Sequence, residues 1–472
     1  MATVIIDPER VARSNEAPVR SDGAYVLYWV ERAQRAEDNP ALEHAIRTAN
    51  ALGLPVLVTV ALSHAEPDLN PRHAAYMVAG LADVATGLRR RGVAFAPRFG
   101  DPPDVVLRLA RDAAMVVCDR GYLRHQRAWC RRVAAASPVR VERVEADVVV
   151  PADAADDGRA YAARTFRPKI WRQVPRFLHE LAPTPAARRE PDLTLEDPHA
   201  SFDPRDVAGT LARWGVQGPV PPVRDAQSGT KAAKRALRHF VRERLARYAE
   251  DRNQPSREGP SGLSAALRYG HVSPVTVALW AREAAPEGAT LEAFLEQLIT
   301  RRELAVNFVL HAEDDYDRYA SLPRWARATL DAHRGDARPA LPDDVALENA
   351  ETDDPYWNAA MSEMRATGYM HGHMRMYWGK RILAWSRTPE EGFARTLALN
   401  DRWFLDGRDP NGVANVAWCY GLHDRPWPER PIFGTVRTMT PAGLRRKTDP
   451  EAYLRKVARL AGGDDAGTGP WT

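Results

Sequence analysis

Cysteine is scarce in this sequence, and the patterns typical of zinc sites, membrane-spanning helices and secretory signals are missing. The 472 residues include three widely spaced cysteines, Cys118, Cys130 and Cys419, which are too few for a disulfide framework and include no CxxC pair of the kind found in zinc sites. No apolar run approaches the ~18 residues of a membrane-spanning helix. The first residues carry acids and lack the apolar region of a secretory signal. We therefore expect a protein of the reducing cytoplasm, with no metal site and no membrane contact.

The chain also has little net charge. The chain has 66 Lys and Arg against 62 Asp and Glu, a net charge of +4, which only weakly favours an anionic partner. Six of the cations are lysines and the rest are arginines. Arginine suits phosphate and base contacts, but GC-rich codon usage also enriches it. The positions of the arginines therefore matter more than their number.

The first third of the chain contains strands that alternate with helices. Apolar runs predict strands at 24–30, 55–62, 93–99, 114–118 and 140–150. Between them, the spacing of apolar residues predicts helices at 40–52, 73–91, 102–111 and 124–136. This alternation predicts a parallel, doubly wound sheet. No GxGxxG follows the first strand, so the usual dinucleotide-binding fingerprint is absent.

The remainder divides into a linker and a helical region. Residues 151–225 are rich in Pro, Asp and Arg and predict a long linker with one short helix near 170–181. Helices are then expected at 231–247, 262–268, 274–284, 291–311, 355–385, 389–401 and 450–460. The expected organisation is a disordered tail (1–20), an α/β domain (21–150), the linker (151–225) and an all-α domain (226–472).

The expected helix 355–385 carries an aromatic stripe. Trp378 and Trp385 are seven residues apart, or two turns of one helix face, and His371 and Arg375 share that face. By itself such a stripe is typical of core packing. His371 and His373 do not predict a metal site, because residues two apart on a helix point to different sides.

Two further segments have the composition of ligand sites. Residues 399–412 are dense in Asp, Asn, Gly and Pro, which predicts a tight turn, and the aromatic and Arg-bearing residues that follow favour a pocket over a bare connector. Residues 260–264 place Ser and Gly at the start of a helix, where free backbone N–H groups suit a phosphate. Taken alone, this second segment is better explained by an ordinary serine N-cap.

Six motifs occur in order along the chain: YVLYWVERAQRAE (25–37), DRGYLR (119–124), AARTFRPKI (162–170), RREL (301–304), HGHMRMYW (371–378) and LDGRDPNG (405–412). In these motifs the chain resembles the class II cyclobutane pyrimidine dimer photolyases of the photolyase–cryptochrome family. The resemblance spans roughly residues 21–455. It implies an α/β domain followed by a helical FAD domain, as the periodicity predicts independently.

The resemblance implies FAD, active in its reduced form, within the helical domain. Asn400 matches the residue that faces flavin N5, Asp406 one beside the isoalloxazine ring, and Arg375 one between the flavin and the substrate. Other matched positions are Tyr248, Ser261, Leu263 and Ser264, for the phosphates and ribityl chain, and Asp409 and Asn411. For the α/β domain, a deazaflavin antenna and no antenna remain two alternatives.

The implied reaction is light-driven DNA repair. The excited reduced flavin passes an electron to a pyrimidine dimer flipped out of UV-damaged DNA, the cyclobutane ring splits, and the electron returns. The residues that match dimer contacts are Met376 and Trp418. An electron relay to the flavin is matched by Trp378 and then Trp357, and Trp385 is either a more exposed member of the relay or a packing residue. The matched DNA contacts, mainly to phosphate, are Arg252, Arg425 and Arg437. We expect a monomer without an obligate protein partner, in the cytoplasm and at the nucleoid if bacterial.

Two departures from the family lie where the substrate is read. Gln297 stands where the family usually has a glutamate that hydrogen-bonds the dimer, and an amide can donate and accept but cannot hold a proton. Residues 418–424 form a segment that is one residue shorter than usual. Two alternatives therefore stay open: a flavin photoreceptor that does not repair, and a photolyase for another lesion such as the six-four photoproduct, for which His423 would be one of two histidines.

Overall fold

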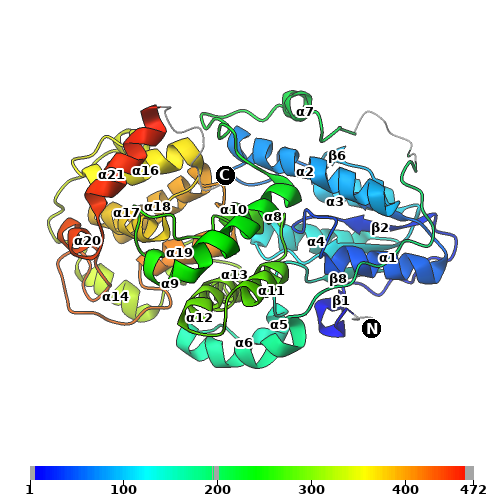
Figure 1. Ribbon diagram of the computed structural model, residues 1–472, viewed down its shortest axis with the longest axis horizontal. Helices are drawn as coiled ribbons and strands as arrows, with labels where there is room; N and C mark the ends of the chain where they lie inside the picture. The colour runs from blue at the N-terminus through cyan, green and yellow to red at the C-terminus, as the bar shows by residue number, and fades with distance from the viewer. Residues whose placement is uncertain (1–5, 194, 196–200, 463–472) are drawn as a thin grey trace.

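The structure, a computed structural model, describes residues 6–193, 195 and 201–462. An α/β half, with strands and helices from blue to cyan, lies beside a helical half coloured from green to red (Figure 1). The elements of the α/β half are β1 (Val11–Arg13), β2 (Tyr25–Trp29), α1 (Pro40–Leu52), β3 (Val56–Thr59), β4 (Ala61–Leu62), α2 (Pro71–Arg91), β5 (Ala94–Phe95), β6 (Arg98–Phe99), α3 (Pro102–Ala110), β7 (Ala113–Asp119), α4 (Arg124–Ala136) and β8 (Val141–Val144).

The main sheet has the strand order β1-β8-β7-β2-β3-β5. All of its pairings are parallel except β1 with β8, so the expectation of a parallel, doubly wound sheet is confirmed. Helices cover both faces, and β2 and β7 are accordingly buried at every position. The expected strands 55–62 and 93–99 each form two short pieces, and β4 pairs with β6 in a second, two-stranded sheet.

The expected disordered tail is wrong for residues 6–20. Residues 1–5 lie outside the described residues, but β1 pairs antiparallel with β8, with Val11 opposite Val144. The buried Arg10 guanidinium donates to the carbonyl oxygens of Glu145, Val148 and Val149. The open edge of β8 has unpaired backbone groups, and this short segment satisfies them.

The segment 151–225 is more ordered than a linker. It contains α5 (Ala152–Ala155), α6 (Ala163–Phe177) and α7 (Val207–Trp214). The helix expected at 170–181 therefore begins and ends earlier. Phe166, Ile170 and Phe177 on α6 pack into the core of the helical half, which is why this helix lies beneath α12 and α13 in Figure 1.

The helical half is built from short helices. They are α8 (Gly229–His239), α9 (Tyr248–Asp251), α10 (Ser264–Arg268), α11 (Pro274–Ala284), α12 (Ala289–Leu295), α13 (Arg302–His311), α14 (Arg324–Ala332), α15 (Asp344–Asn349), α16 (Pro355–Thr367), α17 (Gly372–Ala384), α18 (Pro389–Trp403), α19 (Pro410–Cys419), α20 (Pro441–Lys447) and α21 (Pro450–Gly462). A π-helical turn, Glu296–Arg301, joins α12 to α13. Helix α19 occupies part of the segment expected to be a turn, so only residues 404–409 connect it to α18. No described helix is long and apolar enough to cross a membrane.

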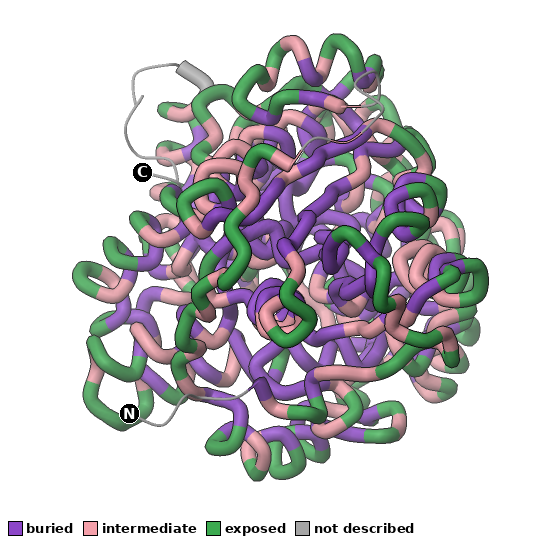
Figure 2. Tube along the Cα trace, turned by 90° about the vertical axis from the view of Figure 1, so that its right-hand side faces the viewer, coloured by how far each residue is buried: buried purple, intermediate pink, exposed green. Residues whose placement is uncertain are grey.

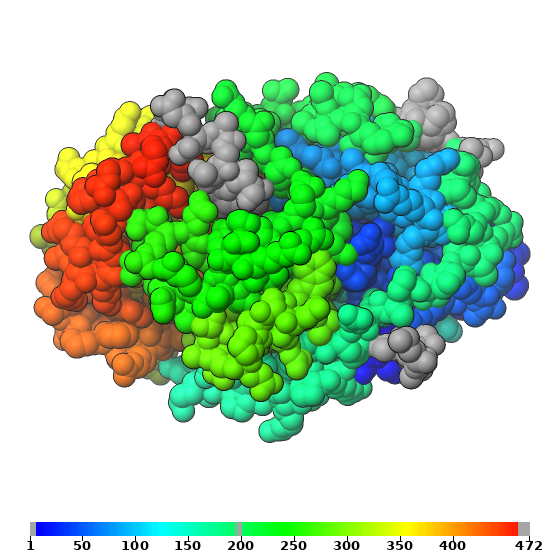
Figure 3. Space-filling model, viewed as in Figure 1, coloured from blue at the N-terminus to red at the C-terminus, as the bar shows by residue number. Residues whose placement is uncertain are grey.

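A buried ionic network joins the two halves. Arg32, after β2, pairs with Asp147 at 3.0 Å and with Asp409, at the start of α19, at 2.9 Å. Arg302 donates to the same Asp147, and the Glu303 carboxylate accepts from the backbone N–H groups of Val149 and Val150. Removing one partner would leave an uncompensated buried charge, which is strongly destabilising. The RREL motif therefore fixes the orientation of the helical half. Buried segments run through the interior of the molecule (Figure 2), and at the surface the two halves lie directly against each other (Figure 3).

Candidate active site

A break between α16 and α17 shapes the site. The sequence predicts one helix over 355–385, but Gly368 ends α16 with φ +69°, a left-handed conformation that favours glycine. His371 then begins α17, and its Nδ1 accepts from the backbone N–H of His373 at 3.1 Å. The expectation of one continuous helix is wrong because this cap and the glycine turn the chain back. As a result α16 and α17 pack against each other.

Helices α9, α10, α17, α18 and α19 contribute residues to the lining of a cavity of about 330 Å³, here called the inner cavity. Of the expected cofactor-binding residues, six line it: Tyr248, Ser264, Arg375, Asn400, Asp406 and Asn411. These residues come from α9, α10, α17, α18, α19 and the loop after α18. The fold therefore brings together side chains that are up to 163 residues apart in sequence.

Asn400 presents an unpaired oxygen inside this cavity. Its Nδ2 donates to Asp401 Oδ1 at 2.8 Å, an oxygen that also accepts from the backbone N–H of Arg408. Burial raises the pKa of Asp401 to about 6, and the two hydrogen bonds oppose that rise. Asn400 Oδ1 is buried and has no hydrogen-bond partner among the described residues. A buried oxygen of this kind is suited to a ligand N–H donor.

Arg375 and Asp406 form an ion pair in the wall of the inner cavity. Arg375 Nη2 lies 2.8 Å from Asp406 Oδ1, and the guanidinium stacks over the Phe404 ring at 3.7 Å from its centroid. Both side chains are largely buried, so their orientation is fixed before any ligand arrives.

Three tryptophans lead away from the inner cavity. Trp378 lines the cavity, and its ring stacks on Trp357 at 6.3 Å between centroids and 10° between planes. Trp357 then contacts Trp385 at 5.5 Å. The row therefore runs from Trp378 to Trp357 to Trp385 and passes through α16. Trp385 is only 2 % exposed, with Arg381 stacked over it, so the alternative of an exposed final member is not supported.

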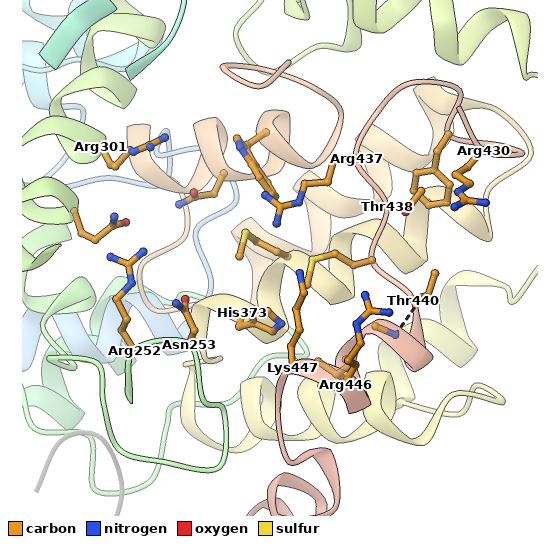
Figure 4. A pocket seen from close by; sticks show the side chains of 18 of the residues that line it. Arg252, Asn253, Arg301, His373, Arg430, Arg437, Thr438, Thr440, Arg446 and Lys447 are labelled. Carbon is orange, nitrogen blue, oxygen red and sulfur yellow. Dashed lines mark hydrogen bonds between the residues drawn. The ribbon is translucent and has the colours of Figure 1, made fainter. Parts of the chain in front are cut away.

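A second, larger cavity opens beside the first. This outer cavity measures about 960 Å³ and is lined by residues of α9, the turn before α13, α17, α19, α20 and the loop before α20. Its cations are Arg252, Arg301, Arg430, Arg437, Arg446 and Lys447. No carboxylate occurs among the described residues that line it. Figure 4 shows these cations pointing into one shared space from different elements, so the surface suits a polyanion.

Of the expected DNA contacts, Arg252, Met376, Trp418 and Arg437 line the outer cavity. Arg437 stacks over Trp418 at 5.7 Å and over Trp427 at 4.8 Å. Behind Trp418 lies the fully buried Lys380, whose ammonium donates to the Cys419 carbonyl and sits 5.4 Å from the Trp418 ring. Burial lowers the pKa of Lys380 to about 8.

Four expected site residues lie elsewhere. Asp409 lines neither cavity, because its carboxylate caps α19 and pairs with Arg32 between the two halves. Leu263 is buried in the core, and the Ser261 hydroxyl accepts from the Leu263 backbone N–H. Arg425 lies outside both cavities and stacks on Trp427. For Asp409, spacing in the sequence gave no sign of a partner 377 residues away.

The structure adds residues that sequence reasoning missed. Tyr369 lines the inner cavity, and His373 and Asn415 line both cavities. His423 lines neither: it lies beside Phe308, with its ring centroid 6.0 Å away, and burial lowers its pKa to about 3. The signal for His373 was its place in the motif HGHMRMYW, three residues before Met376 and therefore on the same helix face.

The sequence matches known proteins along its whole length. Residues 26–188 match the DNA photolyase family. A deoxyribodipyrimidine photo-lyase of Methanothermobacter thermautotrophicus is 41 % identical over 97 % of this chain and 99 % of its own. The enzyme of the same name from Potorous tridactylus is 35 % identical over 94 % of this chain and 83 % of its own.

Two solved structures share the fold. A class III photolyase of Agrobacterium tumefaciens has a TM-score of 0.69 at 19 % identity and covers 94 % of this chain and 90 % of its own. A cryptochrome of Synechocystis has a TM-score of 0.71 at 16 % identity, and the match covers 91 % of this chain and 88 % of the cryptochrome. An α/β half followed by a helical half is therefore an architecture that this chain shares with solved proteins.

Proposed function

This chain belongs to the photolyase–cryptochrome family, and from that membership we propose that it is a deoxyribodipyrimidine photo-lyase that repairs cyclobutane pyrimidine dimers in DNA with light. The observation that carries the proposal is the joining of two cavities. A cationic cavity opens beside an inner cavity whose wall begins a row of tryptophans. The motifs shared with class II enzymes make that class the expected subgroup.

The inner cavity fits the isoalloxazine part of FAD. Its volume of about 330 Å³ lies within the range of ligand pockets, ~300–1,000 Å³. The unpaired Asn400 Oδ1 suits the flavin N5–H, and the Arg375–Asp406 pair offers a fixed cation beside the ring. Tyr248 and Ser264 would hold the chain that leads to the diphosphate. When bound in its reduced form, FAD supplies the light-driven electron that opens the cyclobutane ring.

The chain's own residues stabilise charge in the inner cavity, relay electrons to it and contact the dimer. Arg375 stabilises negative charge in the inner cavity, and Asp406 holds the guanidinium in place. Trp378 and Trp357 relay electrons toward the inner cavity when the cofactor is oxidised; their rings are buried, so water is excluded from the row. Met376 and Trp418 contact the flipped dimer, which costs less to extrude than intact bases because it pairs poorly.

One small cavity in the α/β half lies where its parallel strands end. The cavity at the carboxyl ends of β2 and β3 measures about 50 Å³, well below the ~300 Å³ at which ligand pockets begin. Trp29, Glu31, His125 and Trp129 fill it, and burial raises the pKa of Glu31 well above its usual range. This cavity is smaller than a deazaflavin needs, and both antenna alternatives stay open to the spectroscopic test below. The proposed repair reaction does not require an antenna.

Both cavities are built from a single chain, so we propose that the enzyme acts as a monomer without an obligate protein partner. Because its substrate is chromosomal DNA, we place it in the cytoplasm, and at the nucleoid in a bacterial cell. Of the two other functions, the six-four alternative loses its candidate histidine, since His423 lines neither cavity.

The test is repair under illumination. Purified protein should contain one FAD, and its absorption spectrum before and after denaturation identifies the flavin and any antenna chromophore. With the flavin reduced, blue light should convert a dimer-containing oligonucleotide to intact pyrimidines, and a dark sample should not. Protein that binds FAD but repairs no dimer in light would contradict the proposal and favour the photoreceptor.

Arg437→Ala should weaken binding to damaged and undamaged DNA alike. Arg437 lies in the outer cavity and has no ion-pair partner among the described residues, so it is free to contact a phosphate. Loss of one phosphate contact should lower the slope of log affinity against log salt by about one. Fluorescence anisotropy at several salt concentrations measures this slope.

Arg89→Ala is the matched control, since it removes the same charge from an exposed ion pair with Asp192 in the α/β half. Its salt slope should equal that of the unchanged protein. If Arg437→Ala also keeps the full slope, Arg437 does not contact a phosphate.

A further inference from the structure

Six residues line both cavities and so form the passage between them. Two of the six are not available as neutral hydrogen-bonding groups in this passage. Met376 is apolar, and the Arg252 guanidinium is directed to the Ala293 carbonyl at 3.3 Å. The other four carry neutral amide or imidazole groups: Asn253, Gln297, His373 and Asn415. We call these four residues the collar.

The collar side chains have no partners of their own. None of the four makes a side-chain hydrogen bond to another described residue, and none of their polar atoms is sealed from the cavities. Polar groups at such positions in folded proteins are normally paired with protein, water or a ligand. Asn253 and Asn415 are exposed and can bond to water, whereas the half-buried Gln297 and His373 lie where a ligand that donates and accepts hydrogen bonds can pair with them.

Charge distinguishes the collar from the outer cavity, and one cation, Arg252, also lines the passage. The outer cavity beyond the collar carries Arg430, Arg437, Arg446 and Lys447, whereas the collar is uncharged. Phosphates are held by cations, and bases are read through neutral hydrogen bonds to their edges. The collar is thus placed to read base edges while the cations hold the backbone.

His373 is the collar member at the capped start of α17. It lies in the first turn of α17, and its backbone N–H is bound by the capping His371 Nδ1 at 3.1 Å. Met376, three residues later, lies on the same helix face and also lines the passage. Figure 4 shows the His373 ring directed into the cavity beside Lys447.

The imidazole of His373 is neutral at pH 7. Burial, with the nearby charges of Lys447 and Arg437, lowers its pKa below the usual value of 6.5. A neutral imidazole has one N–H donor and one acceptor nitrogen. It can therefore pair with a carbonyl oxygen or a ring N–H of a pyrimidine without adding a phosphate-binding charge.

We propose that His373 is a specificity-determining residue that hydrogen-bonds a base edge of the flipped pyrimidine dimer. The inference rests on the proposed function. It assigns to His373 the share of lesion recognition that Gln297 alone does not supply, since the two side chains border the same passage. Loss of the imidazole should therefore reduce the preference for damaged DNA and leave phosphate binding unchanged.

The experiment compares dark binding of dimer-containing and undamaged duplexes by fluorescence anisotropy. In His373→Phe, the ratio of the two affinities should fall about tenfold, the effect of one lost hydrogen bond to a buried group. Affinity for undamaged DNA and the salt slope should not change. His373→Gln, which keeps a donor and an acceptor, should retain most of the preference.

The matched control is His239→Gln, at the exposed end of α8 and outside both cavities, which should bind as the unchanged protein does. FAD content reports on folding, and His373→Met replaces the Phe variant if the larger ring does not fit. A His373→Phe or His373→Met protein with the full preference for damaged DNA would overturn the inference. If the unchanged protein shows no preference at all, it is the proposed function that fails.

Discussion

Trp378→Phe should abolish light-driven reduction of oxidised FAD in this protein while leaving repair by chemically pre-reduced enzyme intact. Trp378 is the tryptophan of the row that lines the inner cavity, and Trp357 stacks on it. Phenylalanine fills most of the same space but is not oxidised at a useful potential, so electrons from Trp357 would have to pass a gap in the row. The measurement is the rate of flavin reduction under blue light with an external reductant.

Trp214→Phe is the matched control, because Trp214 is equally buried but lies on α7, far from the row in sequence and packed against the α/β core. It should photoreduce at the unchanged rate. A Trp378→Phe protein that photoreduces as fast as the Trp214 variant would show that the relay does not begin at Trp378.

Gln297→Glu should raise the yield of dimer repair per absorbed photon. Gln297 lies in the passage between the two cavities and has no side-chain partner among the described residues. A protonated carboxyl group donates a stronger hydrogen bond than an amide to the dimer as negative charge develops on it. One better bond is worth ~1–3 kcal/mol, enough to favour ring splitting over return of the electron.

The gain should depend on pH, because only the protonated acid can donate. Half-burial favours the protonated form, whereas Arg252 and Arg301 in the same cavity favour the carboxylate. The gain is therefore present below the pKa of the new carboxyl group and is lost as the pH rises through it. Repair yields with pre-reduced flavin, at several pH values on one dimer oligonucleotide, measure this.

Gln217→Glu, at an exposed position before α8, adds the same charge outside both cavities and should leave the yield unchanged. A yield of the unchanged protein equal to or above that of Gln297→Glu at every pH would refute this account. No repair by either protein would instead favour the photoreceptor.

The sheet could be predicted because each strand is specified locally. Residues 24–30 and 114–118 are continuous apolar runs, and such runs between amphipathic helices have one stable arrangement, a parallel sheet covered on both faces. The edge strand β1 could not be predicted in this way. The segment Val11–Arg13 is only three residues long and lacks an apolar run, and it becomes a strand only because β8 leaves an edge to pair with.

The site could be predicted only where motif residues kept their roles. Asn400, Asp406 and Arg375 meet in the inner cavity, as the resemblance implied. Asp409 belongs to the same motif, LDGRDPNG, yet its carboxylate turns to Arg32 in the other half. A motif match identifies a residue as part of the family pattern. Only the packing of distant segments shows whether its side chain faces a ligand site or stabilises the fold.

The sequence by itself determined the order of the two halves, the parallel sheet and the family, because periodicity and motifs are properties of neighbouring residues. The tertiary structure alone decided the path of the tryptophan row and the membership of the collar. Trp378 and Trp385 share one helix, but their link passes through Trp357, which reaches them only because Gly368 ends α16 and turns the chain back. His373 and Gln297 likewise line one passage only because the fold brings α17 and the turn before α13 to the same cavities, and no local pattern encodes such a meeting of separate segments.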